Sequence, residues 1–285
     1  MNEVAGIRDI RRRIRSVANM QQITKAMKMV AAAKLRKSQE KVVASRPYSK
    51  QIQDVLSRLV QVQTDVSHPL LEKRPVKKVG YILVTSDRGL CGGFNANLIR
   101  LTRSLLEENK GVNVGLVAVG RKGNDYFGKG RAEVIRSITG LGDNPDYGVA
   151  RQVAQEVIKL YTSGELDEVY LVYSKFISVL TQEPSLQKLL PIESSGEKPA
   201  GLYTFEPEPQ QMLERLLPKY IESQLFSALL ESKAGEMGAK MTAMDSATEN
   251  AKDMIAKLTL AMNRARQAAI TKEISEIVGG AAALE

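Results

Sequence analysis

Both ends of this chain are long stretches without proline. No proline occurs before Pro47 and none occurs after Pro218. Both stretches are rich in Ala, Lys, Arg, Glu, Met and Leu, which favour helix. A helix of about 65 residues would extend for roughly 100 Å. A single helix of that length cannot bury its apolar stripe in an ordinary domain, so it needs a partner helix, and the other end of the same chain can supply one.

The apolar residues of the first stretch recur at helical steps of three and four: Ile7, Ile10, Ile14, Val17, Met20, Ile23, Met27, Val30 and Leu35. A mean step near 3.5 favours left-handed supercoiling. Pro47 predicts a bend or a restart of this helix. The last stretch carries small residues at helical spacing around Gly235 and Gly238. We expect the two long helices to approach each other closely along this lane.

The middle of the chain has the pattern of a small parallel sheet. Residues 79–84, 114–119 and 169–173 are continuous apolar runs, which are typical of strands buried on both faces. Helical patterns at 97–108, 121–127 and 147–161 lie between them. This alternation predicts a Rossmann-like α/β domain. Residues 176–182 and 202–205 are weaker strand candidates near an edge.

The predicted fold class is therefore α/β plus long helices. Residues 1–67 and 208–285 form an antiparallel, left-handed two-helix coiled coil, and residues 76–205 form the central α/β domain. Because the bend near Pro47 shortens the first arm, we expect the last helix to extend beyond it by ~20 Å. That end, residues 274–285, contains a run of small apolar residues, which predicts insertion into a partner.

The positive charge of the chain is concentrated at its start. Residues 1–50 hold thirteen Lys and Arg against three acids, a balance of +10, so the remaining residues of this chain of net charge +9 come to −1. Such an arm predicts an acidic partner: nucleic acid, anionic lipid or an acidic protein surface. The absence of aromatic residues before Tyr48 counts against nucleic acid. No apolar run approaches the ~20 residues that cross a bilayer.

The sequence offers no convincing active site. Residues 86–95 follow the first predicted strand and are rich in glycine, but they lack the Gly-Lys-Ser/Thr of a phosphate-binding loop, which favours a structural turn. His68 is the only histidine, so neither a histidine metal cluster nor a histidine-based triad can form. Cys91, the only cysteine, excludes an internal disulfide and is expected to be a small buried residue. We expect no catalytic residue, no metal and no cofactor.

Three motifs carry a resemblance that covers the whole length. Residues 270–283 read Ile-Thr-Lys-Glu-Ile-Ser-Glu-Ile-Val-Gly-Gly-Ala-Ala-Ala and follow Asn-Arg-Ala-Arg-Gln at 263–267. With residues 7–36 and 86–95, they resemble the gamma subunit family of F-type ATP synthases. The resemblance implies a non-catalytic rotor shaft whose terminal helices coil inside a ring of alpha and beta subunits. The α/β domain would stand on the membrane c-ring and bind the epsilon subunit. Proton-driven rotation would then be coupled to ATP synthesis or hydrolysis at the beta-subunit sites.

The resemblance also transfers contact positions onto this chain. They are Met27 in the first helix and Arg266, Gln267, Thr271 and Glu273 in the last. Bacterial members are resembled most, which implies a peripheral protein at the cytoplasmic face of the cell membrane, with no nucleic acid bound and no direct membrane insertion. Two other hypotheses remain at this point: an RNA-binding basic coiled coil, and a nucleotide-dependent enzyme that uses the central sheet. Co-purification with ATP-hydrolysing subunits, with RNA or with nucleotide distinguishes the three.

Overall fold

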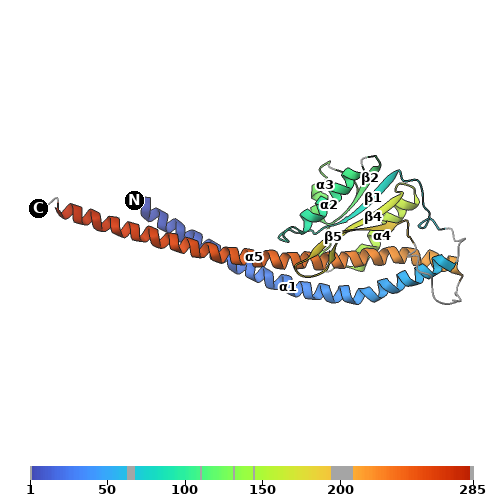
Figure 1. Ribbon diagram of the computed structural model, residues 1–285, viewed down its shortest axis with the longest axis horizontal. Helices are drawn as coiled ribbons and strands as arrows, with labels where there is room; N and C mark the ends of the chain where they lie inside the picture. The colour runs from blue at the N-terminus through green and yellow to red at the C-terminus, as the bar shows by residue number, and fades with distance from the viewer. Residues whose placement is uncertain are drawn as a thin grey trace. The chain divides into compact units, whose positions relative to one another are not determined.

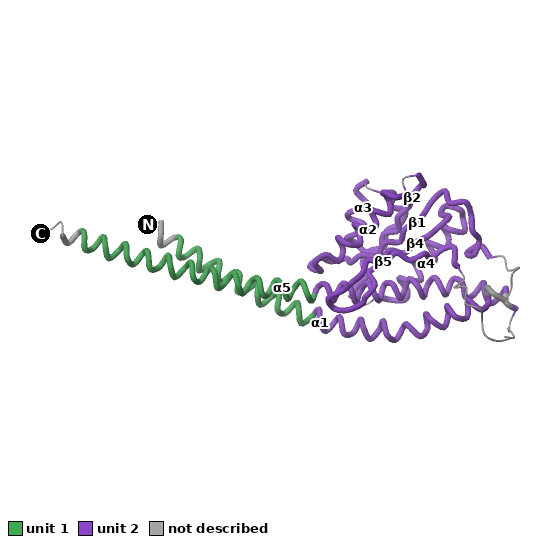
Figure 2. The backbone as a smooth tube through the Cα atoms, in the orientation of Figure 1, with its two compact units in different colours: residues 1–30, 241–285 green, residues 31–240 purple. Residues whose placement is uncertain are grey.

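The computed structural model describes residues 2–62, 68–109, 111–130, 132–143, 145–193 and 208–282. It contains two compact units (Figure 2): a terminal unit of residues 1–30 and 241–285, and a central unit of residues 31–240. The long helices α1 (Asn2–Val62) and α5 (Pro209–Ala282) contribute to both. The predicted fold class, long terminal helices that pack together and a central α/β sheet, is confirmed. The predicted boundaries at 67, 76, 205 and 208 stay a prediction.

The central unit is built on a five-stranded sheet in the order β3-β2-β1-β4-β5. The strands are β1 (Lys78–Val84), β2 (Asn113–Val119), β3 (Glu133–Ile138), β4 (Glu168–Phe176) and β5 (Gln182–Leu190). The first four are parallel, and β5 is antiparallel to β4. The three apolar runs of the sequence are β1, β2 and β4, and β1 lies at the centre, where both faces are covered.

Sequence patterns missed the two edge strands. β3 has no buried residue, and β5 contains Pro184, which is tolerated on an edge because no neighbour needs its missing N–H. The predicted strand at 176–182 is wrong, because this segment is mostly the turn between β4 and β5. The candidate at 202–205 lies outside the described residues.

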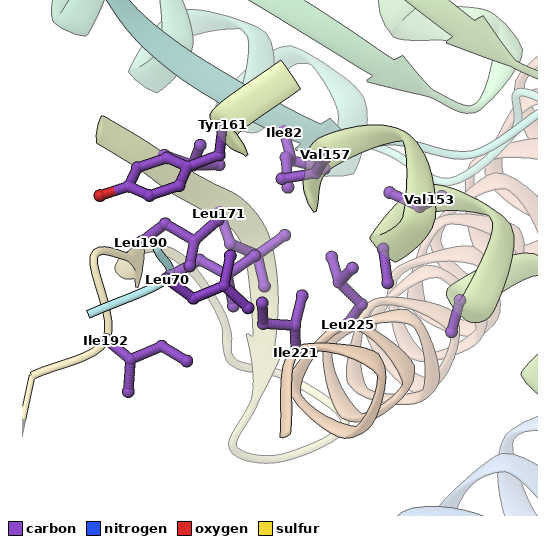
Figure 3. Packing of buried hydrophobic residues seen from close by; sticks show 14 of the residues in the cluster. Leu70, Ile82, Val153, Val157, Tyr161, Leu171, Leu190, Ile192, Ile221 and Leu225 are labelled. Carbon is purple, nitrogen blue, oxygen red and sulfur yellow. The ribbon is translucent and has the colours of Figure 1, made fainter. Parts of the chain in front are cut away.

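Helices cover both faces of the sheet (Figure 1). α2 (Phe94–Glu108) and α3 (Arg121–Phe127) pack on one face, and α4 (Tyr147–Thr162) and α5 pack on the other. The core under α4 and α5 includes Ile82, Val157, Leu171, Ile221 and Leu225 (Figure 3). α5 runs between the sheet and α1 in this unit, so most of its circumference from residue 221 to 238 is buried.

The contact between α1 and α5 has a strict heptad spacing. The α1 residues on this seam are buried or half-buried and alternate in steps of four and three. In the terminal unit they are Ile10, Ile14, Val17, Gln21, Thr24 and Lys28, and in the central unit Ala31, Leu35, Ser38, Val42, Ser45, Ser49, Ile52, Leu56 and Leu59. The 3.5-residue repeat is that of a left-handed coiled coil.

The seam differs from the apolar stripe that the sequence predicts. Met20, Ile23 and Val30 are more than half exposed. They precede the seam positions Gln21, Thr24 and Ala31 by one residue, and a step of one rotates a side chain by about 100° around a helix. The prediction followed hydrophobicity, but the heptad continues through polar and small residues.

Two pairs of hydroxyl groups fix the antiparallel register. Thr24 Oγ1 lies 2.8 Å from Thr248 Oγ1 in the terminal unit, and Ser49 Oγ lies 2.9 Å from Ser223 Oγ in the central unit. The residue numbers add up to 272 in each pair, and this sum defines the register within each unit. By this register Asn2 lies opposite Ile270. The last turns of α5, from Ile270 to Ala282, therefore extend past α1 by about 18 Å.

Pro47 does not interrupt α1, which is continuous from Asn2 to Val62. The residue is exposed, so the carbonyl that its missing N–H leaves free can be hydrated. The predicted restart of the helix at this position is wrong.

The small residues of α5 face a different neighbour from the one predicted. A Cβ atom at Gly235 would lie 3.0 Å from Ser174 Oγ and 3.3 Å from Phe94 Cε2, and one at Gly238 would lie 3.3 Å from the Val179 carbonyl oxygen. These neighbours belong to the sheet and to the loops and helix beside it. The two glycines allow α5 to approach the α/β layers closely, and the predicted close approach to α1 is wrong here.

We expect Gly235→Leu to lower the free energy of unfolding of the purified chain by about 1–3 kcal/mol, because the new side chain overpacks the contact with Ser174 and Phe94. Denaturant titration measures the change. Gly6→Leu is the matched control: a Cβ at Gly6, also in a long helix, meets nothing within 4 Å. The control should be neutral or slightly stabilising. Equal stability of both variants would contradict the close packing of Gly235 against Ser174 and Phe94.

Candidate partner-binding surface

The end of α5 presents an uncovered apolar face. Every described side chain from Ile270 to Gly279 is exposed. Ile270, Ile274, Ile277 and Val278 are each about half exposed or more. Their spacing of four, seven and eight residues places them on one side of the helix. An apolar face of this kind on a helix without a partner marks a site of interaction with another protein.

Four of the five predicted contact residues lie beside this face. Arg266, Gln267, Thr271 and Glu273 are all exposed on α5. The Thr271 hydroxyl donates to the carbonyl of Gln267 within the helix, at 2.9 Å. The structure therefore places these four residues within about two turns of one another.

Met27 lies elsewhere in the terminal unit. It is half-buried on α1, opposite Asp245 in the register. The ammonium of the next residue, Lys28, lies 2.5 Å from the Asp245 carboxylate. Asp245 and Arg266 are 21 residues apart on α5, or about 31 Å. Met27 and the other four residues therefore form two separate surfaces.

The first turns of α1 are strongly basic on their exposed side. Arg8, Arg11, Arg13 and Arg15 are exposed, and Arg12 pairs with Asp9 at 3.0 Å. Guanidinium groups held on a rigid helix attract an acidic protein surface. The terminal unit thus combines a basic stretch on α1 with an apolar face on α5.

The glycine-rich segment 86–95 is a turn held by its own side chains. The Asn95 side-chain oxygen accepts the backbone N–H of Ser86 at 3.0 Å. The Asp87 carboxylate accepts the N–H groups of Arg121, Gly140 and Leu141 at 2.9, 3.2 and 2.7 Å. Backbone donors at this edge of the sheet are those that a bound phosphate would need. Here a carboxylate of the chain already uses them. The role of Asp87 was not visible in the sequence.

The remaining candidates from the sequence are Cys91, a metal site and a membrane span. Cys91 is 2% exposed, which confirms the prediction of a small buried residue, and burial raises the pKa of its thiol. Among the described residues, no three His, Cys, Asp or Glu side chains are grouped so that they could hold a metal ion. Within the same residues, no helix has a stretch that is both long and apolar enough to span a bilayer.

Comparison with known families agrees with a shaft-like subunit of a larger assembly. The family model described as ATP synthase matches residues 6–284, so the class of protein is an ATP synthase subunit. The ATP synthase gamma chain of Desulfitobacterium hafniense is 64% identical over 282 residues, which are 99% of this chain and 100% of the relative. That of Heliobacterium modesticaldum is 58% identical over 289 residues, with 98% and 99% covered.

Solved structures share the fold. The central stalk and c-ring structure of Tetrahymena thermophila mitochondrial ATP synthase contains a chain with a TM-score of 0.63 and 25% identity, covering 79% of this chain and 99% of that one. A chain of the Euglena gracilis mitochondrial enzyme has a TM-score of 0.71 and 21% identity, covering 98% and 95%. The chain belongs to the ATP synthase gamma chain family. It is thus a central-stalk component and a non-catalytic subunit.

We expect removal of residues 274–285 to leave the thermal midpoint of the purified chain within about 2 °C of wild type, because the described part of this segment, 274–282, lies beyond Asn2 of α1 in the register. Removal of residues 258–285 is the matched comparison. It also deletes the seam residues Leu258, Met262, Ala265 and Ala269 and should lower the midpoint of the transition or abolish its cooperativity. A large loss from the shorter deletion would show that the end of α5 is held within the chain.

Proposed function

We propose that this chain is the rotor shaft of a bacterial F-type ATP synthase, which couples proton-driven rotation of a membrane c-ring to ATP synthesis or hydrolysis at the beta-subunit sites. The observation that carries the proposal is the antiparallel pairing of α1 and α5 in each unit, fixed by Thr24–Thr248 in the terminal unit and by Ser49–Ser223 in the central unit. Two helices that pack along a heptad seam resist bending and twisting better than either helix alone.

The terminal unit is the part that we place inside the ring of three alpha and three beta subunits. The exposed face of Ile270, Ile274, Ile277 and Val278 suits an apolar collar at the top of that ring. Burial of these four side chains would stabilise the seat by several kcal/mol, at roughly 1.5–3 kcal/mol for a fully buried residue. The basic start of α1 suits acid-rich segments of the beta subunits.

Two levels of contact follow from the positions of the predicted residues. Arg266, Gln267, Thr271 and Glu273 would touch the upper part of the ring, and Met27 would touch it about 31 Å further along the shaft. A two-helix shaft has no three-fold symmetry. Each of three identical beta subunits would therefore meet a different face, and rotation would exchange the faces among them.

The central unit would stand on the c-ring and bind the epsilon subunit. In this arrangement the chain is peripheral, at the cytoplasmic face of the cell membrane. The turn at 86–95 supports a mechanical rather than a nucleotide-binding role, because Asp87 takes the backbone donors at the carboxyl edge of the sheet.

A reconstitution experiment tests the proposal. The purified chain is mixed with the alpha and beta subunits of the same enzyme, and native mass spectrometry gives the stoichiometry. We expect one copy of this chain for three alpha and three beta subunits. A complex that RNase dissolves would favour the RNA-binding alternative, and nucleotide bound by the isolated chain would favour the enzyme alternative.

We expect Arg266→Ala to slow ATP-driven proton pumping in inverted membrane vesicles about five-fold, the factor that corresponds to an interaction of about 1 kcal/mol. Arg264→Ala is the matched control, because Arg264 is also exposed but points to roughly the opposite side of the helix. Pumping with Arg264→Ala should equal that of wild type. Equal effects of the two substitutions would remove the support for a specific contact at Arg266.

A further inference from the structure

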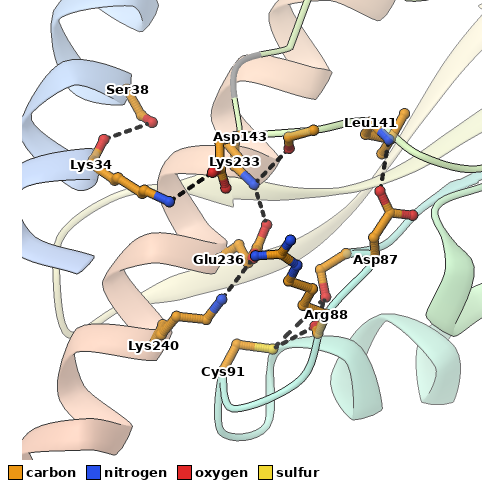
Figure 4. A network of polar contacts seen from close by, with 12 residues as sticks. Lys34, Ser38, Asp87, Arg88, Cys91, Leu141, Asp143, Lys233, Glu236 and Lys240 are labelled. Atoms are coloured by element: carbon orange, nitrogen blue, oxygen red, sulfur yellow. Dashed lines mark hydrogen bonds and ion pairs between the residues drawn. The ribbon is translucent and has the colours of Figure 1, made fainter. Parts of the chain in front are cut away.

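The loop between β3 and α4 bonds to both long helices of the central unit (Figure 4). The Asp143 carboxylate accepts a hydrogen bond from Lys34 Nζ of α1 at 2.8 Å. The neighbouring Gly142 carbonyl accepts one from Lys233 Nζ of α5 at 3.1 Å. Two successive residues of one loop thus hold one helix each.

The same loop is fixed to the sheet. Asp87, three residues after the end of β1, accepts the N–H groups of Gly140 and Leu141. The Leu141 side chain packs against the core under α4 and α5. Gly140 and Gly142 have φ values of 81° and 67°, which only glycine adopts without strain. Residues 140–142 of the loop are therefore held in a defined conformation that is anchored to the sheet.

The bond to α5 ends in a nearly buried ionic cluster. Glu236 lies between Lys233 and Lys240, at 3.0 and 3.1 Å. All three side chains are 15% exposed or less. Buried ion pairs hold a defined geometry because separating them leaves an uncompensated charge. Lys233 is therefore held in place to bond the loop.

The Lys34–Asp143 hydrogen bond is far along α1 from the residues that α1 contributes to the core under α4 and α5. Leu56 and Leu59 are the α1 residues of that core cluster. Lys34 is 22 residues from Leu56, or about 33 Å along the helix. Between these points α1 follows α5 along the seam. The Lys34–Asp143 pair thus attaches α1 to the α/β layers at a point far along the helix from Leu56.

We propose that the β3–α4 loop is a torque strut, in which Lys34 and Asp143 are positioning residues that make α1 turn with the sheet. The proposal rests on the rotor function. The side chains of Lys34 and Asp143 are 38% and 52% exposed, so the ion pair contributes little to the free energy of unfolding. When the shaft is twisted, however, the ion pair keeps the sheet from rotating about α5 unless α1 rotates with it. The strut acts on coupling and not on folding.

Charge reversal tests the strut in the assembled, membrane-bound enzyme. The variants are Lys34→Asp, Asp143→Lys and the double variant that restores an ion pair with its charges exchanged. The readouts are protons pumped per ATP hydrolysed, the rate of hydrolysis, the thermal midpoint and hydrogen exchange at the Leu141 amide. Lys37→Asp is the matched control, because Lys37 is an exposed α1 residue one turn away.

We expect each single reversal to lower the protons pumped per ATP two- to five-fold, roughly the range set by an exposed ion pair, with hydrolysis and thermal midpoint unchanged. Exchange at Leu141 should rise by a similar factor. The double variant should recover both, and Lys37→Asp should match wild type. If a charge reversal prevents assembly of the enzyme, Asp143→Asn and Lys34→Gln are used instead, because they only remove the charge. They should also lower the protons pumped per ATP, by a smaller factor.

Unchanged pumping in the single variants, or a double variant no better than the singles, overturns the strut while the rotor function stands. A failure of the rotor function looks different, because then the complex with the wild-type chain would itself hydrolyse ATP without pumping protons.

Discussion

The register of α1 against α5 is the constraint on which the other features depend. The heptad runs from Ile10 to Leu59 with no insertion, and the hydroxyl pairs Thr24–Thr248 and Ser49–Ser223 show the same register in each unit. A slip by one heptad would place Thr24 against Met241 or Ile255 and would separate Lys28 from Asp245. Polar seam residues of this kind select a register at some expense of stability. The length of α5 left without a partner follows directly from it.

α5 has to satisfy two neighbours at once in the central unit, and this explains its composition. The side towards α1 carries the heptad residues, such as Ser223, Leu230 and Met237. The side towards the α/β layers carries Gly235 and Gly238, where a Cβ would crowd Ser174, Phe94 or the Val179 carbonyl. Glycine in a helix interior costs about 1 kcal/mol relative to alanine, and close contact with the sheet offsets that loss.

Much of the fold could be predicted because its strongest patterns are local. Two long proline-poor stretches and three continuous apolar runs gave α1, α5, β1, β2 and β4. The edge strands β3 and β5 escaped because one face of an edge strand is solvated and Pro184 is allowed there. The seam was misplaced by one residue between Met20 and Val30, since Gln21, Thr24 and Lys28 are held in it by position and not by hydrophobicity. The helical spacing of the small residues of α5 does not indicate which element they contact, because that is decided by the tertiary structure.

The candidate site was only partly visible for the same reason. The spacing of Ile270, Ile274 and Ile277 is that of any amphipathic helix, and only the register shows that Ile274 and Ile277 lie beyond Asn2 of α1. Their partner contacts came from a family resemblance and not from the pattern.

Asp87 occupies the edge of the sheet at which related folds bind phosphate. The carboxyl edge of a parallel sheet is where doubly wound folds bind phosphate, because backbone N–H groups converge there. In this chain one carboxylate takes three such donors, those of Arg121, Gly140 and Leu141. Two of the three belong to the β3–α4 loop that reaches Lys34 and Lys233. The Asp87 carboxylate therefore lies where a phosphate would bind, and its hydrogen bonds also attach the β3–α4 loop to the sheet. In such an arrangement the edge that would serve chemistry in an enzyme becomes an attachment point for the shaft.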